Sequence, residues 1–229
     1  MKQDLQLPAA ILLDGLGTLV ALEPPAPLLV EELRERLGIA VTEEQAQRAI
    51  AAEIAYYRAH LDEGHDLSSL ADLRRRCAKV LRDALPPGTS VSDADGDLIQ
   101  QALLASLRFT AYPDVRPALE LLRARCHLLV VVSNWDVSLH DVLQRLELAP
   151  LLDGIVTSAE AGARKPSAAI FVRALALAGV GPSEAIHVGD SVEEDLAGAR
   201  AAAIEPVLIS RDGKPGPAEV RVVASLLEL

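Results

Sequence analysis

Polar residues with chemical potential follow short apolar runs at several points in this chain. Asp14, Ser133 and Asp190 each come one or two residues after such a run, and Lys165 comes just before a helical pattern. Two carboxylates from different strands can hold Mg²⁺ through oxygen ligands. A carboxylate can also act as a nucleophile that divides one difficult transfer into two steps. A hydroxyl and an ammonium group beside them would bind an anion, so these residue types predict a site for a negatively charged substrate.

An alternation of strands and helices must bring these residues together. From Val115 onward, short aliphatic runs alternate with amphipathic helical patterns, which is typical of parallel βαβ units. The runs Leu128–Val132 and Pro206–Ile209 are continuously apolar, as expected of strands covered by helices on both faces. The expected elements are helix 115–125, strand 128–132, helix 137–146, strand 154–157, helix 167–178, strand 185–188, helix 193–202 and strand 206–209.

An early strand, Ala10–Leu13, completes a doubly wound parallel sheet. Ligands bind at the carboxyl ends of the strands in such sheets, which is where the polar residues lie. The fold class predicted is therefore α/β, with a Rossmann-like core.

The segment Pro24–Leu107 carries only helical patterns. Its first leucine stripe ends at Gly38, and Thr42 with Gln45 forms a capping box that opens a helix towards His60. Further helix starts are predicted at Ser69 and at Ser92-Asp93-Ala94-Asp95. These patterns predict a bundle of about four helices. The predicted domains are an α/β core of residues 1–20 and 110–229 and an inserted helical domain of residues 22–108.

Composition narrows the possible functions. Half of the 229 residues are hydrophobic and 24% are charged, which excludes a disordered chain. The formal net charge of −11 disfavours nucleic acid and anionic membranes as partners. No apolar run reaches 18 residues, and the N-terminus reads as a strand rather than a signal peptide. Two cysteines, Cys77 and Cys126, are expected to be buried and reduced, as in a cytoplasmic protein. Oligomeric state is not predicted.

Four motifs in order resemble those of the haloacid dehalogenase-like hydrolase superfamily, in the subfamily with a helical cap inserted after the first motif. The first is Asp14-Gly-Leu-Gly-Thr-Leu, and the second is an apolar strand that ends at Ser133-Asn134. The third is Lys165-Pro166, and the fourth is His187-Val-Gly-Asp-Ser running to Asp195. The resemblance covers essentially the whole chain.

The resemblance implies a role for each matching residue. Asp14 would be the nucleophile and would form an aspartyl-phosphate. Mg²⁺ would be held by Asp14, by the backbone carbonyl of Leu16 and by Asp190, with Asp195 supporting the site. Phosphate binding would fall to Thr18, Ser133, Asn134 and Lys165. The activity implied is Mg²⁺-dependent hydrolysis of small phosphate esters.

One position departs from the family pattern. Leu16 stands where the family has the aspartate that serves as general acid and base. General acid–base help contributes roughly 10²–10⁴-fold to a rate, so alkyl phosphates would be poor substrates. Three functions stay open: a phosphatase that is slow or limited to good leaving groups, a 2-haloacid dehalogenase, and a weakly active or non-catalytic relative. Asp190 favours the phosphatase, whereas a dehalogenase would need a cation near the halide, such as Arg58 or one of Arg74–Arg76.

Overall fold

The computed structural model describes residues 8–87, 89, 95–125 and 127–229. The chain divides into two compact units. The α/β unit consists of the described residues up to Ala21 together with 111–229, and the helical unit consists of the described residues of 22–110.

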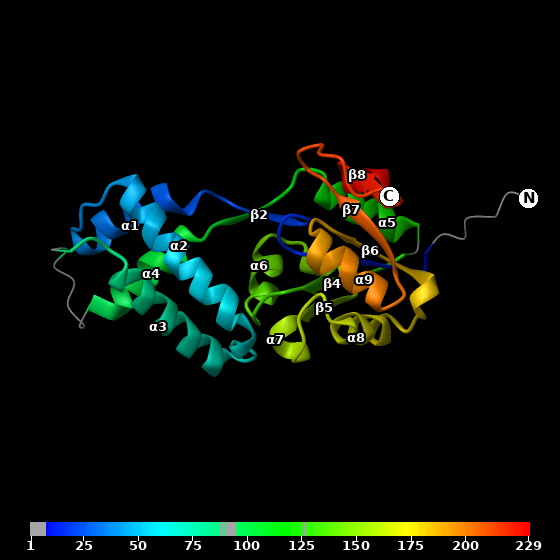
Figure 1. Cartoon of the computed structure of the whole chain (residues 1–229), viewed down its shortest axis with the longest axis horizontal. Coiled ribbons are helices and arrows are strands. Elements are labelled where there is room, and N and C mark those ends of the chain that lie inside the picture. Colours follow the sequence, from blue (N-terminus) through cyan, green and yellow to red (C-terminus); the bar gives the residue numbers. More distant parts are fainter. Residues whose placement is uncertain (1–7, 88, 90–94, 126) are drawn as a thin grey trace, which may run out of the picture. The chain divides into compact units, whose positions relative to one another are not determined.

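A six-stranded parallel sheet forms the centre of the α/β unit (Figure 1). Its spatial order is β5-β4-β1-β6-β7-β8. The strands are β1 (Ala10–Leu13), β4 (Leu128–Ser133), β5 (Gly154–Thr157), β6 (Ala185–Gly189), β7 (Glu205–Ile209) and β8 (Arg221–Val223). The predicted doubly wound α/β fold is confirmed. The short edge strand β8 was not predicted.

The strand order places a topological switch point at β1. After β1 the chain builds β4 and β5 on one side, and then crosses to build β6, β7 and β8 on the other. Leu13 at the end of β1 is level with Val131 of β4 and Val188 of β6. The residues that follow these three strands therefore meet at one edge, where ligands bind in open parallel sheets.

Helices cover the sheet through apolar side chains. They are α5 (Val115–Ala124), α6 (Leu139–Arg145), α7 (Ser158–Ala161), α8 (Ala168–Ala178) and α9 (Ala197–Ala201), with short turns η3 (Ala149–Leu151), η4 (Pro182–Glu184) and η6 (Leu226–Glu228). Ile170 and Phe171 of α8 belong to one buried cluster with Leu12 and Val130 of the sheet. Fully buried strands explain why these runs carry no polar alternation.

The predicted helix 193–202 begins differently. A π-helical turn, η5 (Val192–Leu196), precedes α9, because Leu196 N donates to Ser191 O five residues back, at 3.1 Å. Such widened turns occur frequently at functional sites. This turn carries Asp195, which is buried.

The helical unit contains α1 (Pro25–Leu37), α2 (Glu43–His60), η1 (Leu61–Glu63), α3 (Leu67–Asp83) and α4 (Gly96–Ser106). Gly38 ends α1 with φ of 67°, and the capping box of Thr42 and Gln45 is present. The predicted start at Ser69 is wrong, since α3 begins at Leu67 and Asp66 caps it by accepting from Ser69 N at 2.8 Å. The predicted start at 92–95 falls mostly outside the described residues.

Two short strands lie where the chain passes between the units. They are β2 (Val20–Leu22) and β3 (Phe109–Ala111), which pair with each other. Within the helical unit, Leu29, Leu33, Ile50, Leu81 and Leu103 belong to a separate buried core. Each unit thus has its own hydrophobic core.

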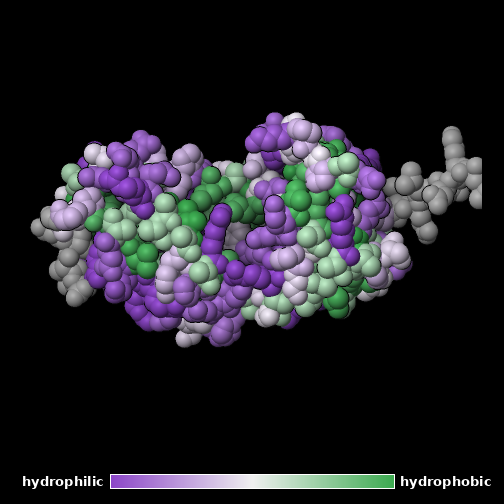
Figure 2. Space-filling view, in the orientation of Figure 1, coloured by the Kyte–Doolittle hydropathy of each residue, from purple (hydrophilic) through white to green (hydrophobic). Residues whose placement is uncertain are grey.

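Surface properties follow the composition. Hydrophilic side chains cover much of the visible surface of both units (Figure 2). Among the described helices, none combines the length and apolarity needed to cross a membrane. Cys77 is buried and forms no disulfide, whereas Cys126 lies outside the described residues.

Candidate active site

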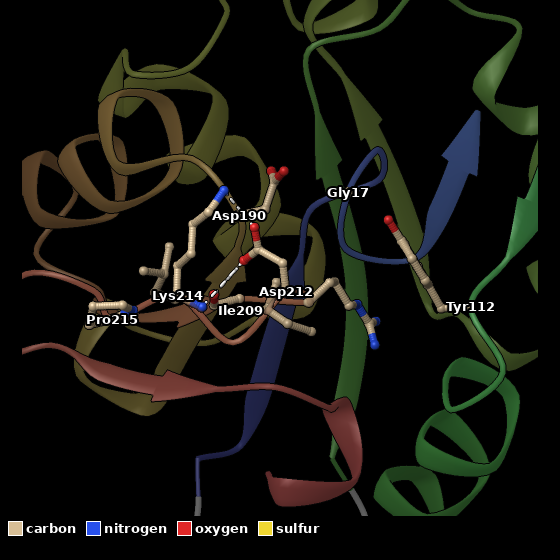
Figure 3. Close-up of a pocket in the computed structure, with 10 residues that line it drawn as sticks. Gly17, Tyr112, Asp190, Ile209, Asp212, Lys214 and Pro215 are labelled. Carbon is tan, nitrogen blue, oxygen red and sulfur yellow. Dashed lines mark hydrogen bonds and ion pairs between the residues drawn. The ribbon is translucent and has the colours of Figure 1, made fainter. Parts of the chain in front are cut away.

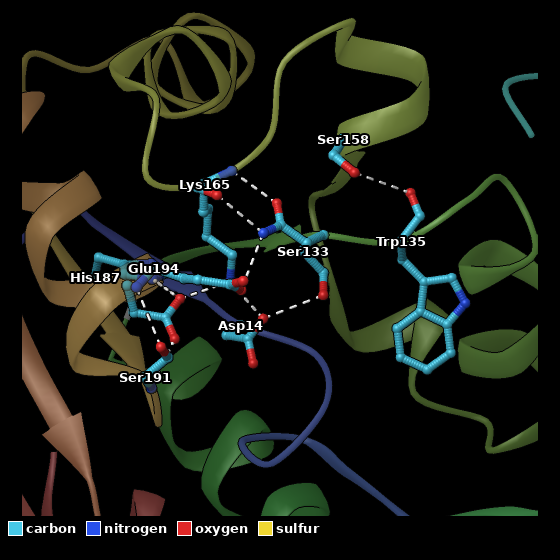
Figure 4. A network of polar contacts seen from close by, with 10 residues as sticks. Asp14, Ser133, Trp135, Ser158, Lys165, His187, Ser191 and Glu194 are labelled. Atoms are coloured by element: carbon cyan, nitrogen blue, oxygen red, sulfur yellow. Dashed lines mark hydrogen bonds and ion pairs between the residues drawn. The ribbon is translucent and has the colours of Figure 1, made fainter. Parts of the chain in front are cut away.

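The carboxylate of Asp14 lies at the end of β1 with two donors on one of its oxygens. Lys165 Nζ is 2.5 Å from Asp14 Oδ1, and Ser133 Oγ donates to the same oxygen at 3.1 Å (Figure 4). All three residues are at most 5% exposed. The structure thus brings Ser133 and Lys165 to Asp14, which lies more than 100 positions from each in the sequence. Oδ2 of Asp14 stays outside these bonds.

Lys165 bridges two carboxylates. Its Nζ lies 2.6 Å from Asp195 Oδ1 as well as against Asp14. Burial alone would lower the pKa of Lys165, but Asp14 and Asp195 outweigh it and raise the pKa above its usual value. The ammonium therefore stays charged and can neutralise negative charge at Asp14 and on a bound anion.

The two carboxylates that Lys165 bridges, Asp14 and Asp195, have pKa values that are shifted in opposite directions. Burial raises the pKa of Asp14 from 3.8 to about 6, and Lys165 only partly offsets it. Burial acts on Asp195 as well, but Lys165 and a hydrogen bond from His187 hold the pKa of that carboxyl well below its usual range. Asp195 is a permanent anion, whereas Asp14 carries an uncompensated cost of ionisation that a further cation would relieve.

Carboxylate oxygens of Asp14, Asp190 and Asp195 all lie within 4.8 Å of one another. The oxygens of Asp195 already accept hydrogen bonds from Lys165, His187 and Ser191 N. The Asp190 residue is exposed to solvent, but the protein partly surrounds its carboxyl group. This partial burial and the charge of Asp195 raise the pKa of Asp190. The donors fit a hard divalent cation such as Mg²⁺, with Asp14 and Asp190 as its side-chain ligands.

Gly17 allows Asp190 to approach the loop after β1. Gly17 has φ of 85°, and a Cβ added there would lie 2.1 Å from Asp190 Oδ2. Both residues border a cavity of about 410 Å³ (Figure 3). The rest of its wall comes from Tyr112 and from Leu208, Ile209, Ser210, Arg211, Asp212, Lys214 and Pro215. Asp190 therefore faces open space, as a metal ligand must.

The side chains of Asn134 and Thr18, both expected to bind phosphate, have different surroundings. Asn134 Nδ2 donates to Lys165 O at 3.1 Å and to Glu194 Oε2 at 3.0 Å, which uses both amide hydrogens. Thr18 is wholly buried, and its hydroxyl makes no hydrogen bond among the described residues. Leu16, by contrast, is 39% exposed.

Two polar partners of the site belong to the fourth motif, but no role was predicted for either of them. His187 on β6 donates to Asp195, and Glu194 accepts from Asn134 (Figure 4). The sequence could have predicted a role for His187, because a histidine inside the apolar run of β6 needs a buried hydrogen-bond partner. The signal for Glu194 was weak, since an acidic residue in the first turn of a helix is common.

A doubly wound sheet, an ion-paired aspartate at its switch point and a helical insertion after the first strand together define a class of capped α/β hydrolases. The chain belongs to the haloacid dehalogenase-like hydrolases, a family that matches residues 8–203. The resemblance seen in its four motifs is thereby confirmed.

Several related proteins are similar in sequence to part of the chain. Haloacid dehalogenase-like hydrolase domain-containing protein 3 of Bos taurus is 42% identical over 88 residues, which are 38% of this chain and 35% of that protein. Glyceraldehyde 3-phosphate phosphatase of Methanopyrus kandleri is 39% identical over 101 residues, 44% of this chain and 43% of that protein. The chain thus matches less than half the length of these relatives.

Solved structures match the whole fold. A HAD phosphatase from Thermococcus onnurineus superposes with a TM-score of 0.66 at 26% identity, covering 96% of this chain and 94% of that one. A 2-haloacid dehalogenase from Pseudomonas syringae pv. Tomato DC3000 gives a TM-score of 0.68 at 23% identity, covering 97% and 96%. The second likeness shows the fold alone.

Proposed function

We propose that this chain is a Mg²⁺-dependent phosphatase of small phosphorylated metabolites, with Asp14 as its nucleophile. The observation that carries the proposal is the fixed carboxylate of Asp14, buried against the Lys165 ammonium beside the exposed Asp190. The phosphatase named among the relatives supports a phosphorylated substrate.

The reaction divides into two displacements at phosphorus. In the first, a carboxylate oxygen of Asp14 forms a bond to phosphorus while the bond to the leaving oxygen breaks, which gives an aspartyl-phosphate. In the second, water attacks phosphorus, orthophosphate leaves and the carboxylate returns. Lys165 and Ser133 donate hydrogen bonds at Asp14 Oδ1, where they can reach phosphoryl oxygens as charge develops.

Magnesium would be held by the side chains of Asp14 and Asp190 and the backbone carbonyl of Leu16. It would add positive charge against the phosphoryl oxygens. The raised pKa values of Asp14 and Asp190 support this assignment, because two carboxylates that resist ionisation gain from a shared cation.

Leu16 narrows the substrate class. It offers no group that can protonate a departing alkoxide, so the leaving group must depart as an anion of low basicity. Aryl, acyl and enol phosphates meet this condition, whereas simple alkyl phosphates do not. The chain is therefore proposed to act on phosphates with good leaving groups.

The test is release of p-nitrophenol from p-nitrophenyl phosphate, with Mg²⁺ and with EDTA. Asp14→Asn removes the nucleophile, and Asp141→Asn changes an exposed aspartate of α6 as a matched control. Turnover that needs Mg²⁺, persists in Asp141→Asn and is lost in Asp14→Asn supports the proposal. Absence of turnover in the unmodified chain contradicts it.

A dehalogenase is the second candidate, because halide leaves without a proton and Leu16 would be no handicap. Two of the four arginines that could bind the halide already have carboxylate partners, which weakens this candidate. Arg75 and Arg76 both pair with Asp72, and Arg76 also contacts Glu63. Halide release from short 2-haloacids in the presence of EDTA would favour this function over the phosphatase.

A further inference from the structure

His187 is a wholly buried histidine directly behind the candidate active site. It lies on β6, and its Nε2 is 2.8 Å from Asp195 Oδ1. Its ring meets Phe171 of α8 edge to face, with ring centroids 4.9 Å apart. Nδ1 is buried and has no hydrogen-bond partner among the described residues. One nitrogen therefore serves Asp195, and the other faces the apolar core.

The direction of this bond follows from the chemistry of Asp195. Its carboxyl has a pKa held far below the usual range, so both of its oxygens can only accept. Nε2 must therefore carry the hydrogen and donate it to Oδ1. The same Oδ1 accepts from Lys165 Nζ at 2.6 Å, and Oδ2 accepts from Ser191 N at 3.0 Å.

Asp195 is also fixed sterically. It lies against the backbone of Gly189, where an added Cβ would be 2.1 Å from Asp195 Cγ. The π-helical turn η5 directs its side chain towards β6. Of the donors to Asp195, His187 is the one with a rigid ring packed in the core. Its Nε2 therefore sets the position of Asp195 Oδ1.

We propose that His187 is a positioning residue that acts through Asp195 on Lys165. An ammonium group has three hydrogens. Two point to Asp195 Oδ1 and Asp14 Oδ1, which fixes the direction of the third. In the reaction proposed above, on which this inference rests, the third hydrogen meets a phosphoryl oxygen. Loss of the His187 donor leaves Asp195 Oδ1 bonded to Lys165 alone, so Oδ1 can shift and misalign that hydrogen without removing any group that touches the substrate.

The experiment compares His187→Phe, which keeps a ring but loses the donor, with His187→Gln, whose amide nitrogen replaces Nε2. His140→Phe is the matched control, since His140 lies on α6, bonded to Glu160. With p-nitrophenyl phosphate and Mg²⁺, His187→Phe is expected to lower kcat roughly 10–100-fold with KM changed less than about twofold, as for other outer supporting residues. His187→Gln is expected to recover most of kcat, and His140→Phe to match the unmodified chain.

Thermal unfolding of each variant separates positioning from folding. The inference is overturned if His187→Phe is folded and its kcat lies within about twofold of that of the unmodified chain. It is also overturned if His187→Gln is folded and loses as much kcat as His187→Phe.

A second measurement does not depend on activity. ¹⁵N NMR of histidine-labelled protein is expected to show a hydrogen on Nε2 of His187. A hydrogen on Nδ1 together with an unprotonated Nε2 would overturn the inference. If the hydrogen is on Nε2 but the unmodified chain shows no turnover, only the proposed phosphatase function is contradicted.

Discussion

Asn134 and Lys165 are joined by a reciprocal pair of hydrogen bonds. Lys165 N donates to Asn134 Oδ1 at 2.7 Å, and Asn134 Nδ2 donates to Lys165 O at 3.1 Å. Asn134, the residue after β4, thus fixes the backbone of Lys165, and the ammonium group of Lys165 contacts Asp14. The contact explains why an amide stands here, because an amide can both donate and accept towards one peptide unit.

Replacing Asn134 tests this clamp. Asn134→Ala removes both bonds and frees the Lys165 backbone, so kcat on an aryl phosphate is expected to fall on the order of 10²-fold, as for a misplacement of about 1 Å. Asn134→Asp keeps the acceptor but loses the donor, and places a charge beside Glu194, so it should be impaired too. Steady-state kinetics of the folded variants check this; normal kcat in Asn134→Ala would refute the clamp.

Removing the charge of Asp14 is expected to abolish turnover and to change how the stability of the fold depends on pH. An acid whose folded pKa is raised is penalised at pH values above that pKa, and the penalty shrinks as pH falls through it. The pKa of Asp14 is raised from 3.8 to about 6, so without metal the penalty is present at about pH 7.5 and partly relieved at about pH 5. Denaturant unfolding should show the stability of Asp14→Asn, relative to the unmodified chain, falling between about pH 7.5 and about pH 5. A difference in stability that is the same at both pH values would contradict the raised pKa.

Restoring a carboxylate at position 16 tests the missing acid. Leu16→Asp is expected to raise kcat on alkyl phosphates by up to about 10²–10⁴-fold, and that on p-nitrophenyl phosphate by much less. Leu16 is 39% exposed, so the change costs little core packing. Leu16→Asn serves as control because it has nearly the same shape without the acid. Similar rates in both variants would show that protonation is not limiting.

Magnesium binding should depend on Asp190. A ligand that binds only the folded state raises its stability with concentration. Mg²⁺ is therefore expected to raise the melting temperature of the unmodified chain, and to have little effect on Asp190→Asn. Asp212→Asn, which alters another acid on the same cavity, should respond like the unmodified chain. An equal rise in Asp190→Asn would remove Asp190 as a ligand.

Elements marked by a continuous apolar run or by a helix cap could be predicted from the sequence. Strand 154–157 and the strand at Ala10–Leu13 were predicted with the observed bounds. The strands β2, β3 and β8 were not, because each has three residues and depends on pairing with distant neighbours. The π-helical turn η5 is invisible to a 3.6-residue pattern.

Within the site, residue types at strand ends predicted that Asp14 and Ser133 come together, because parallel strands bring their carboxyl ends to one edge. Lys165 lies in the loop before α8, and its approach to Asp14 depends on the path of that loop. The bonds of Asn134 could not be predicted, because they depend on where the loop at Lys165 runs. Thr18 shows the same limit: its position in the loop after β1 was clear, whereas its burial depends on packing against distant residues.

The central place of β1 in the sheet has a consequence for how the chain is synthesised. β1 leaves the ribosome long before its neighbours β4 and β6, which begin only at residues 128 and 185. The helical unit is continuous in sequence, so its contacts can form while β1 still waits for partners. The bond between Asp14 and Lys165 spans 151 residues. The candidate active site is therefore among the last parts to assemble, and a chain cut short before β6 exposes β1 as an unpaired apolar edge that invites aggregation.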